Sequence, residues 1–216
     1  MRIMTGLTAL SVASACATAQ LVTPFTETFD TDAQGWLSGS FAPLTHDASG
    51  FVSTTADISA AGPFGLTLFR GHDDFDASGD AFVGDYLSSG ITTISFDIRH
   101  DYSEALDFAL RVAHPANSPG FAIEASSAVA AGEWTTLTFE LDPNNPLYTP
   151  EGPPGFGFFA GVMSQVGNLQ VSLTPPAGLP TGTFVTFDLD NVSITPAPGS
   201  IASISILMLA AARRRR

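Results

Sequence analysis

The order of apolar and polar positions between residues 20 and 195 predicts β-strands rather than helices. Apolar and polar residues alternate over short stretches, and glycine or proline interrupts them at short intervals. In one stretch, Ile94, Phe96 and Ile98 alternate with polar residues, so one face of the expected strand is apolar. The stretches with this pattern are 91–100, 105–114, 133–141, 168–173 and 183–194.

Two of these stretches leave the register of the apolar face open. In 133–141, Trp134 and Leu137 share one face only if a bulge interrupts the strand, and we expect Trp134 in the core, as we do Trp36. In 183–194, either Phe184 or Val185 begins the apolar face. Strands at this spacing with turns between them predict an all-β, antiparallel β-sandwich (jelly roll) over residues 20–195. We expect a long loop over 142–157 and no convincing helix in this body.

The charges are distributed unevenly along the chain. There is no lysine, and all 21 acidic residues lie between Glu27 and Asp190, where three arginines leave a net charge of 3 − 21 = −18. Such a body repels phosphate backbones, so we expect no nucleic-acid partner, and it favours cations. Cys16 is the one cysteine, which excludes a disulfide framework within the chain.

Residues 1–19 have the pattern of an export signal. Arg2 precedes a run of small and apolar residues, and the Ala-Thr-Ala sequence that ends at Ala19 fits the rule for signal cleavage. Lipid attachment at Cys16 is an alternative. Export places the protein at the cell envelope, at the cell surface or in the extracellular matrix.

Residues 196–216 form a short apolar segment with a basic end. As a helix, residues 201–212 would rise about 18 Å, against a hydrocarbon core of about 30 Å, and the final arginines would stay cytoplasmic. This order resembles the PEP-CTERM sorting signals of bacteria that make exopolysaccharide, which implies an exosortase-like processing enzyme and a membrane as partners. The chain has Pro-Ala-Pro-Gly where Val-Pro-Glu-Pro is usual, and a plain tail anchor is the alternative. The sorting residues would be Pro196, Pro198, Arg213, Arg214, Arg215 and Arg216.

Four further motifs occur in order along the body. TETFDTDAQGW at 26–36, GEWTTLTFEL at 132–141 and FDLDNVSI at 187–194 resemble strands of bacterial jelly-roll modules of the galactose-binding-like superfamily. AFVGDYLSSGITTISFDIR at 81–99 is similar to a run in laminin B domains, which also end in an Asp-Asn-Val strand. The resemblance implies a jelly-roll fold and says less about activity.

Two sets of oxygen-bearing residues suggest calcium. The first has the spacing of a calcium loop, with Gly79 at its bend, and the alternative is an acidic surface loop. Its expected ligands are Asp74, Asp76, Ser78, Asp80 and Asp85. The second follows from the resemblance to galactose-binding-like modules, which often hold a structural calcium between the first and last strands. Glu27 and Asp190 match those positions, with Asp30 and Asp188 nearby, and outward-facing acids are the alternative.

No sequence motif indicates catalysis. The four histidines are scattered, there is no G-x-S-x-G, and nothing distinguishes an acid/base pair among the carboxylates, so we expect a non-enzymatic protein. The aromatic residues in or near loops are candidates for stacking on sugar rings. They are Tyr86, Tyr102, Tyr148 and Phe156. The expected function is binding of carbohydrate or exopolysaccharide. The alternatives are a structural, calcium-stabilised surface protein without a specific ligand, and a hydrolase.

Overall fold

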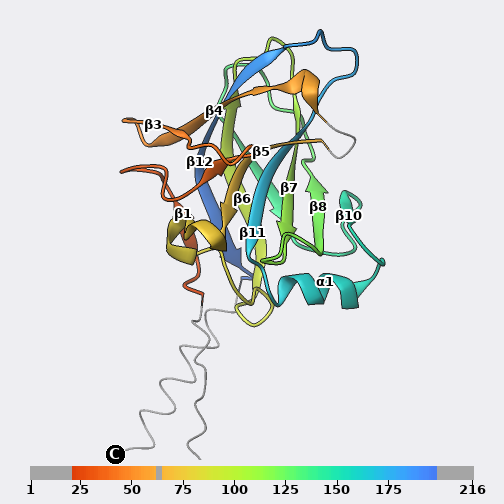
Figure 1. Ribbon diagram of the computed structural model, residues 1–216. Coiled ribbons are helices and arrows are strands. Elements are labelled where there is room, and N and C mark those ends of the chain that lie inside the picture. Colours follow the sequence, from red (N-terminus) through yellow and green to blue (C-terminus); the bar gives the residue numbers. More distant parts are fainter. Residues whose placement is uncertain (1–20, 62–64, 199–216) are drawn as a thin grey trace, which may run out of the picture.

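The alternating stretches form the long strands of two antiparallel sheets in the computed structural model, which describes residues 21–61 and 65–198. Sheet A has the order β3 (Thr45–Asp47), β4 (Phe51–Asp57), β12 (Phe184–Pro196), β6 (Ile91–His100) and β9 (Thr135–Glu140), and β1 (Phe25–Glu27) also pairs with β12. Sheet B has the order β10 (Tyr148–Pro150), β8 (Gly120–Glu124), β7 (Asp107–Ala113), β11 (Asn168–Thr174), β5 (Leu66–His72) and β2 (Leu37–Ser38). Figure 1 shows how the two sheets are arranged.

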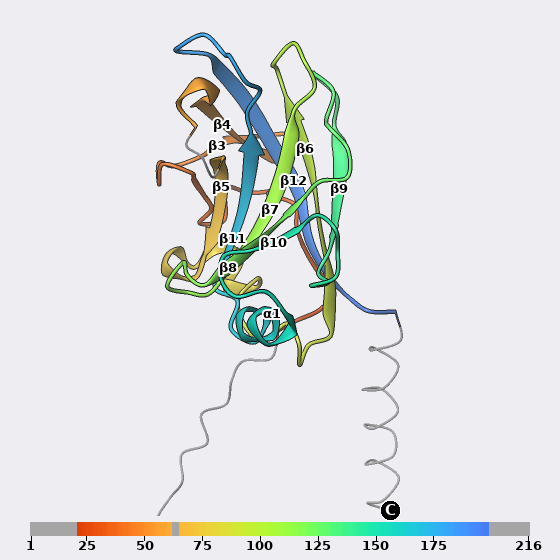
Figure 2. The ribbon, with the colours of Figure 1, turned by 90° about the vertical axis from the view of Figure 1, so that its right-hand side faces the viewer.

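The two sheets lie face to face, as Figure 2 shows from the side, and their apolar side chains form one buried core between them. Every second residue of the central strands is buried, so the period-two pattern is the direct cause of the packing. The inward residues of the two central strands of sheet B are Phe108, Leu110, Val112, Leu169, Val171 and Leu173, and those of sheet A include Ile94, Phe96, Ile98, Phe187 and Leu189. The predicted antiparallel β-sandwich is confirmed.

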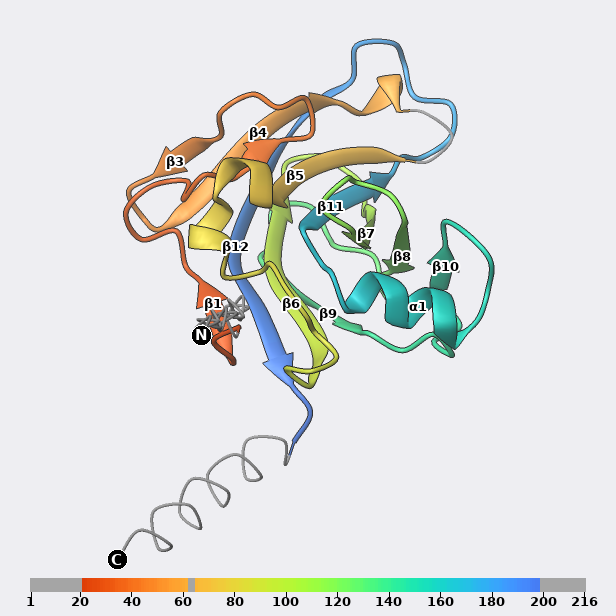
Figure 3. The ribbon, with the colours of Figure 1, turned by 60° about the horizontal axis from the view of Figure 1, so that its bottom comes forward.

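Helical segments are short and lie at the margins of the sandwich. They are η1 (Ile58–Ala60), η2 (Asp73–Phe75), η3 (Ala77–Asp80) and α1 (Phe156–Met163). The expectation of no helix is therefore wrong at α1, which begins at the end of the expected long loop. Phe159 of α1 is buried and packs on Phe121 of β8, with ring centroids 5.3 Å apart, so contact with sheet B stabilises this helix (Figure 3).

The structure resolves the two open registers. Val185 is buried and Phe184 is 68% exposed, and the three-residue step from Leu189 to Val192 is absorbed where β12 shifts register, with Asn191 at a φ of 50°. The expectation that Trp134 is a core residue is wrong. No bulge forms in β9, so Trp134 faces outward and is 39% exposed, while Trp36 is buried as expected.

The two terminal segments lie largely outside the described residues. This applies to the signal 1–19 with its cleavage position Ala19, and to the apolar stretch and the arginines 213–216. Pro196 ends β12, and Pro198 follows it in a turn. No helix in the described part of the chain combines the length and the apolar character needed to cross a membrane.

Candidate functional site

A row of polar side chains crosses the outer face of sheet B, the face turned away from the core. Gln170 of β11 lies opposite Arg70 of β5 on one side and opposite Arg111 of β7 on the other. All three positions alternate with buried apolar residues, so strand geometry alone brings the two arginines to either side of one amide. This places two of the three arginines of the acidic body in a single row.

The Gln170 amide is held between the two guanidinium groups. In the orientation that directs its oxygen at them, that oxygen lies 2.6 Å from Arg70 Nη1 and 2.9 Å from Arg111 Nη1, and its nitrogen donates to the Thr67 hydroxyl. The opposite orientation donates to Asn117 Oδ1 at 2.8 Å but sets an NH₂ group against two cations. The first orientation sets the Gln170 oxygen 2.8 Å from Asn117 Oδ1, but its contacts with two cations outweigh this repulsion, so electrostatics favour it.

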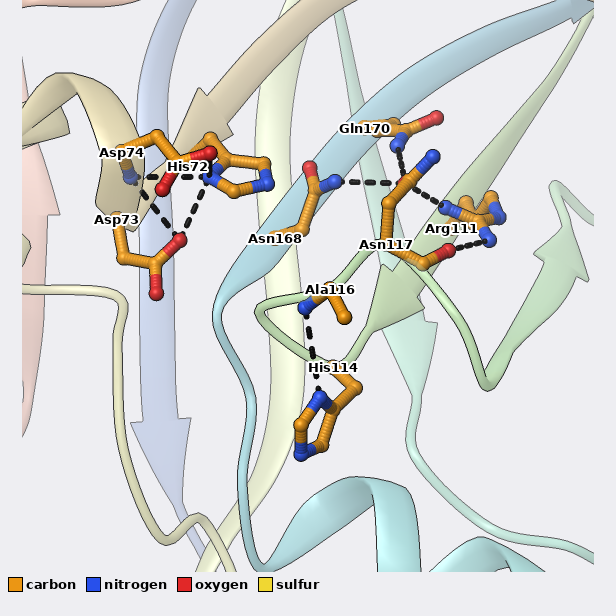
Figure 4. Close-up of polar contacts among 9 residues, drawn as sticks. All are labelled: His72, Asp73, Asp74, Arg111, His114, Ala116, Asn117, Asn168 and Gln170. Atoms are coloured by element: carbon orange, nitrogen blue, oxygen red, sulfur yellow. Dashed lines mark hydrogen bonds and ion pairs between the residues drawn. The ribbon is translucent and has the colours of Figure 1, made fainter.

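A turn between β7 and β8 covers part of this row. Asn117, in this turn, adopts a φ of 61°, and its Oδ1 accepts hydrogen bonds from Arg111 Nη1 at 2.7 Å and from Asn168 Nδ2 at 2.8 Å (Figure 4). Arg111 Nη2 also donates to the Asn117 carbonyl oxygen at 2.7 Å. Asn168 and Gln170 are consequently 1% and 2% exposed although they lie on an outer sheet face. The polar row is thus rigid before any ligand binds.

The two arginines of the row differ in their charge partners. Arg111 forms an ion pair with Glu151, which follows β10. Arg70 donates from Nε to the carbonyl oxygen of Gly39 at 3.3 Å, and among the described residues no carboxylate lies within ion-pair distance of it. Burial, followed by repulsion from Arg111, lowers the pKa of the Arg70 guanidinium from its usual range.

An exposed aromatic ring lies over Arg70. Phe41 belongs to the loop 38–43, and its ring centroid is 4.8 Å from the Arg70 Cζ. Phe41 is 58% exposed and adopts a φ of 64°, a left-handed conformation that is costly for a bulky residue. Gly39 allows this loop to dock on β5, because a Cβ at that position would come within 1.8 Å of the Thr67 carbonyl oxygen. We call Phe41, Arg70, Arg111, Asn117 and Gln170 the sheet B face.

A titratable cluster lies where β5 ends. His72 Nδ1 is 2.6 Å from Asp73 Oδ1 and 3.8 Å from Asp74 Oδ2, and within the described residues this is the one group of at least three His, Cys, Asp or Glu side chains close enough to hold a metal ion. The Nδ1 atom also accepts the backbone N–H of Asp74 at 3.0 Å. His72 therefore caps η2, and its lone pair is already used.

The predicted sugar-stacking aromatics are scattered over the molecule. Tyr86 is fully buried, and its hydroxyl donates to the Phe82 carbonyl oxygen at 2.8 Å, so its ring is not available to a ligand. Tyr102 packs partly against the core, and Tyr148 packs its ring on Phe121. Phe156 is 66% exposed at the start of α1. None of the four contributes to the sheet B face.

The predicted calcium loop folds into η2 and η3. The Ser78 hydroxyl accepts a hydrogen bond from the Trp36 indole at 2.9 Å, and Asp85 accepts from the backbone and hydroxyl of Ser88. Burial, then the charges of Asp76 and Asp73, raise the pKa of Asp80. Asp74 belongs to the cluster at His72. Two of the five expected ligands, Ser78 and Asp85, thus use their side-chain oxygens in hydrogen bonds within the protein, and calcium at this loop stays a prediction.

The second predicted calcium site lies between β1 and β12. Glu27 is 8% exposed, and burial raises the pKa of Asp190, with further contributions from Asp97, Asp30 and Glu27. Asp97 lies directly opposite Asp190 on β6, and the Asn191 amide donates to both carboxylates. Asp188, which we expected nearby, accepts instead from Arg99 and Ser53. The strand pairing thus assembles an acidic group with Asp97 in place of Asp188.

The sequence analysis selected none of the residues of the sheet B face. A usable signal was the scarcity of cations: of the three arginines between Glu27 and Asp190, Arg70 and Arg111 lie in alternating stretches on the polar side. Phe41 gave no signal, because it lies in a loop without periodicity.

The chain matches no family model and no curated protein. Among solved structures, an agarase is similar with a TM-score of 0.50 and 13% identity over 81% of this chain and 24% of that one. The CBM22-1–GH10 modules of Clostridium thermocellum endo-1,4-β-D-xylanase 10B, complexed with xylohexaose, give a TM-score of 0.41 and 17% identity over 79% of this chain and 28% of that one. The L4b domain of human laminin α-2 gives a TM-score of 0.44 and 11% identity over 83% of this chain and 93% of that one.

This chain therefore spans about a quarter of the length of the first two proteins. At 13% identity, the likeness to the agarase supports the sandwich fold alone.

Proposed function

We propose that the protein binds carbohydrate on the sheet B face and has no catalytic activity of its own. The observation that carries this proposal is an exposed ring, Phe41, held over a row of preorganised hydrogen-bonding groups. Sugars present an apolar C–H face and a ring of hydroxyl groups, so an aromatic surface next to fixed amide and guanidinium groups suits both.

The same face suits binding better than hydrolysis. Glu151 is ion-paired with Arg111, and a carboxylate so engaged is poorly suited to act as a general acid. Two surface hollows, one of about 270 Å³ at Pro175 and one of about 560 Å³ at Gln165, are lined by none of the residues of the sheet B face. An open face of this kind would accept a stretch of polysaccharide.

Affinity electrophoresis of the full chain in gels that contain agarose, xylan, cellulose derivatives or bacterial exopolysaccharide tests this function. We expect retardation by at least one polysaccharide and its loss in the variant Phe41→Ala. Phe156→Ala is the matched control, because Phe156 is similarly exposed but lies at α1, away from the sheet B face. Unretarded migration in every gel would refute carbohydrate binding.

We propose that the protein is exported and kept at the cell envelope or in the extracellular matrix, where exopolysaccharide is the ligand. The terminal segments support this proposal by their order alone, with the signal before the body and the apolar, arginine-ended segment after it. Fractionation of cells with an antibody against the body would test it, together with mass spectrometry of both termini. Material that retains residues 1–19 in the cytosol would contradict it.

A structural calcium ion at Glu27 and Asp190 is the second proposal. The carboxylates of Asp97, Asp30 and Glu27 support it, because burial and then their charges raise the Asp190 pKa, and a hard cation would offset that repulsion. No three of these carboxylates lie within metal-binding distance of one another, so the ion would have to draw them closer. We expect calcium to raise the melting temperature of the full chain and a chelator to reverse this. A protein stabilised by calcium that binds no glycan would favour the alternative of a purely structural surface protein.

A further inference from the structure

Arg70 differs from the other arginines of the described body because its charge is not compensated. Arg99 pairs with Asp188, with the two atoms 2.6 Å apart, and Arg111 pairs with Glu151. The described part of the chain offers Arg70 no carboxylate partner. This is unexpected in a body with 21 acidic residues and three arginines, where chance alone would favour an acidic neighbour.

The position of Arg70 makes this lack of a partner costly. Its guanidinium is half-buried, lies below Phe41, and shares the Gln170 oxygen with a second cation, Arg111. Two like charges on one face destabilise each other, and Glu151 pairs with Arg111 alone, so the charge that stays uncompensated is that of Arg70. A bound negative charge at this point of the surface would therefore stabilise the Arg70 guanidinium.

The hydrogen-bonding geometry leaves room for that charge. Arg70 uses Nε for the Gly39 carbonyl and Nη1 for Gln170, and Nη2 has no partner among the described residues. A guanidinium edge with free N–H groups matches the oxygens of a carboxylate or a sulfate. The Arg70 Cζ lies over the Phe41 ring, 4.8 Å from its centroid, so a group bound by this guanidinium would lie near an aromatic ring.

We propose that Arg70 binds the anionic substituent of an acidic sugar unit, a carboxylate or a sulfate, while Phe41 packs against the ring of that unit. This rests on the proposed function and names its ligand class. The −18 charge of the body repels a densely charged chain at a distance, so the favoured ligand carries sparse anionic groups on an otherwise neutral polysaccharide.

Isothermal titration calorimetry with the full chain and matched probe pairs tests the proposal. The carboxylate pair is a xylo-oligosaccharide with a single glucuronic acid branch and its methyl ester, and the sulfate pair is an agaro-oligosaccharide with a single sulfate group and its desulfated form. We expect the charged member of at least one pair to bind about tenfold more tightly, which corresponds to about 1.4 kcal/mol. The pair that shows the preference identifies the anion.

Substitutions at Arg70 locate the preference. In Arg70→Gln the ratio of affinities for the charged and neutral members should fall from about ten to about one, and Arg70→Lys should retain part of it. Arg99→Gln, the same change on the opposite sheet, should keep the full ratio. A thermal melt of each variant checks that it folds.

The outcomes separate this inference from the proposed function. Equal affinity for charged and neutral probes overturns the anionic ligand and leaves carbohydrate binding intact. A preference that survives in Arg70→Gln also overturns it, because the anion then binds elsewhere. Failure to bind any probe or polysaccharide removes the proposed function and this inference together.

Discussion

The outer faces of the two sheets use arginine in opposite ways. On sheet A, the rings of Phe51 and Trp134 contact each other, and the Arg99 Cζ lies over both, 5.3 and 4.7 Å from their centroids. Arg99 also donates two hydrogen bonds to Asp188. On sheet B, Arg70 has a ring on one side and a second arginine nearby, and no acidic residue of the described ranges pairs with it. The aromatic contact is shared, and the charge partner is what differs.

The difference in charge partners indicates that the Arg99 cluster stabilises the fold, whereas the surroundings of Arg70 can accept a ligand. The Arg99 cluster satisfies its own charge, since Asp188 also accepts from Ser53 at 2.6 Å and is 13% exposed. A group that already has its partners gains little from a ligand, whereas an uncompensated, half-buried cation gains a great deal. An exposed aromatic–arginine contact is therefore not sufficient to identify a binding face.

The largest expected effect on stability is at Asp188. We expect Asp188→Ala to lower the free energy of unfolding by about 2 kcal/mol, because it leaves the part-buried Arg99 without its charged hydrogen bonds. Glu151→Ala, at a carboxylate that is 36% exposed, should cost about 1 kcal/mol or less. Urea denaturation measures both. Equal losses would mean that the two ion pairs do not differ as the structure indicates.

The next effect is on binding, at the two exposed rings. Phe41→Ala should weaken glycan affinity about tenfold, or about 1.4 kcal/mol, while the equivalent Trp134→Ala on sheet A should leave it unchanged. Titration with the polysaccharide that retards the protein in electrophoresis would measure both. If Trp134→Ala is the variant that loses affinity, the ligand lies on sheet A and the comparison between the faces is reversed.

A smaller effect concerns the two facing carboxylates of sheet A. Because burial and repulsion raise the Asp190 pKa above 3.8, the stability linked to this group is fully present below the unfolded pKa and is lost as pH rises through the folded pKa. Asp190→Asn should therefore stabilise the calcium-free protein at pH 7 by about 0.5 kcal/mol, within the range of a cross-strand pair of like charges.

Melting temperatures of the wild type and Asp190→Asn between pH 3 and 8, with and without calcium, test whether the substitution stabilises the protein as expected. Asp47→Asn is the opposite case, because hydrogen bonds from Ser49 lower the Asp47 pKa, so its stabilising contribution is present above the unfolded pKa and is lost as pH falls through the folded one. In the presence of calcium, Asp190→Asn should lose stability relative to the wild type if the ion binds there. Identical behaviour of the two variants would contradict both assignments.

The sequence predicted the parts of the structure that depend on periodicity. The inward positions Leu169, Val171 and Leu173 follow from alternation, and so does the outward direction of Gln170. It did not predict that Gln170 is buried on an outer face, because the turn that carries Asn117 folds over it from a distant part of the chain. Long-range coverage of this kind leaves no local pattern.

The two errors at aromatic residues have a related cause. The core position of Trp134 depended on a bulge that would bring it onto the face of Leu137, and because β9 pairs without a bulge, the alternation directs Trp134 outward. Tyr86 was assigned to a loop surface, but tertiary packing buries it and Phe82 accepts its hydroxyl. Periodicity therefore proved a better guide than residue type at Trp134, and neither informed the loop position of Phe41.

The smallest expected effect is also the most direct test of the comparison between the faces. Arg70→Gln should change the free energy of unfolding by no more than about 0.5 kcal/mol, because relief of the repulsion with Arg111 offsets the lost contacts with Gly39, Gln170 and Phe41. Within the described residues the change breaks no ion pair. Arg99→Gln removes a paired and stacked cation, so it should destabilise the protein clearly more. Thermal unfolding of both variants without a ligand measures the difference. A large loss in Arg70→Gln would show that Arg70 mainly stabilises the fold, and the sheet B face would then resemble the Arg99 cluster rather than contrast with it.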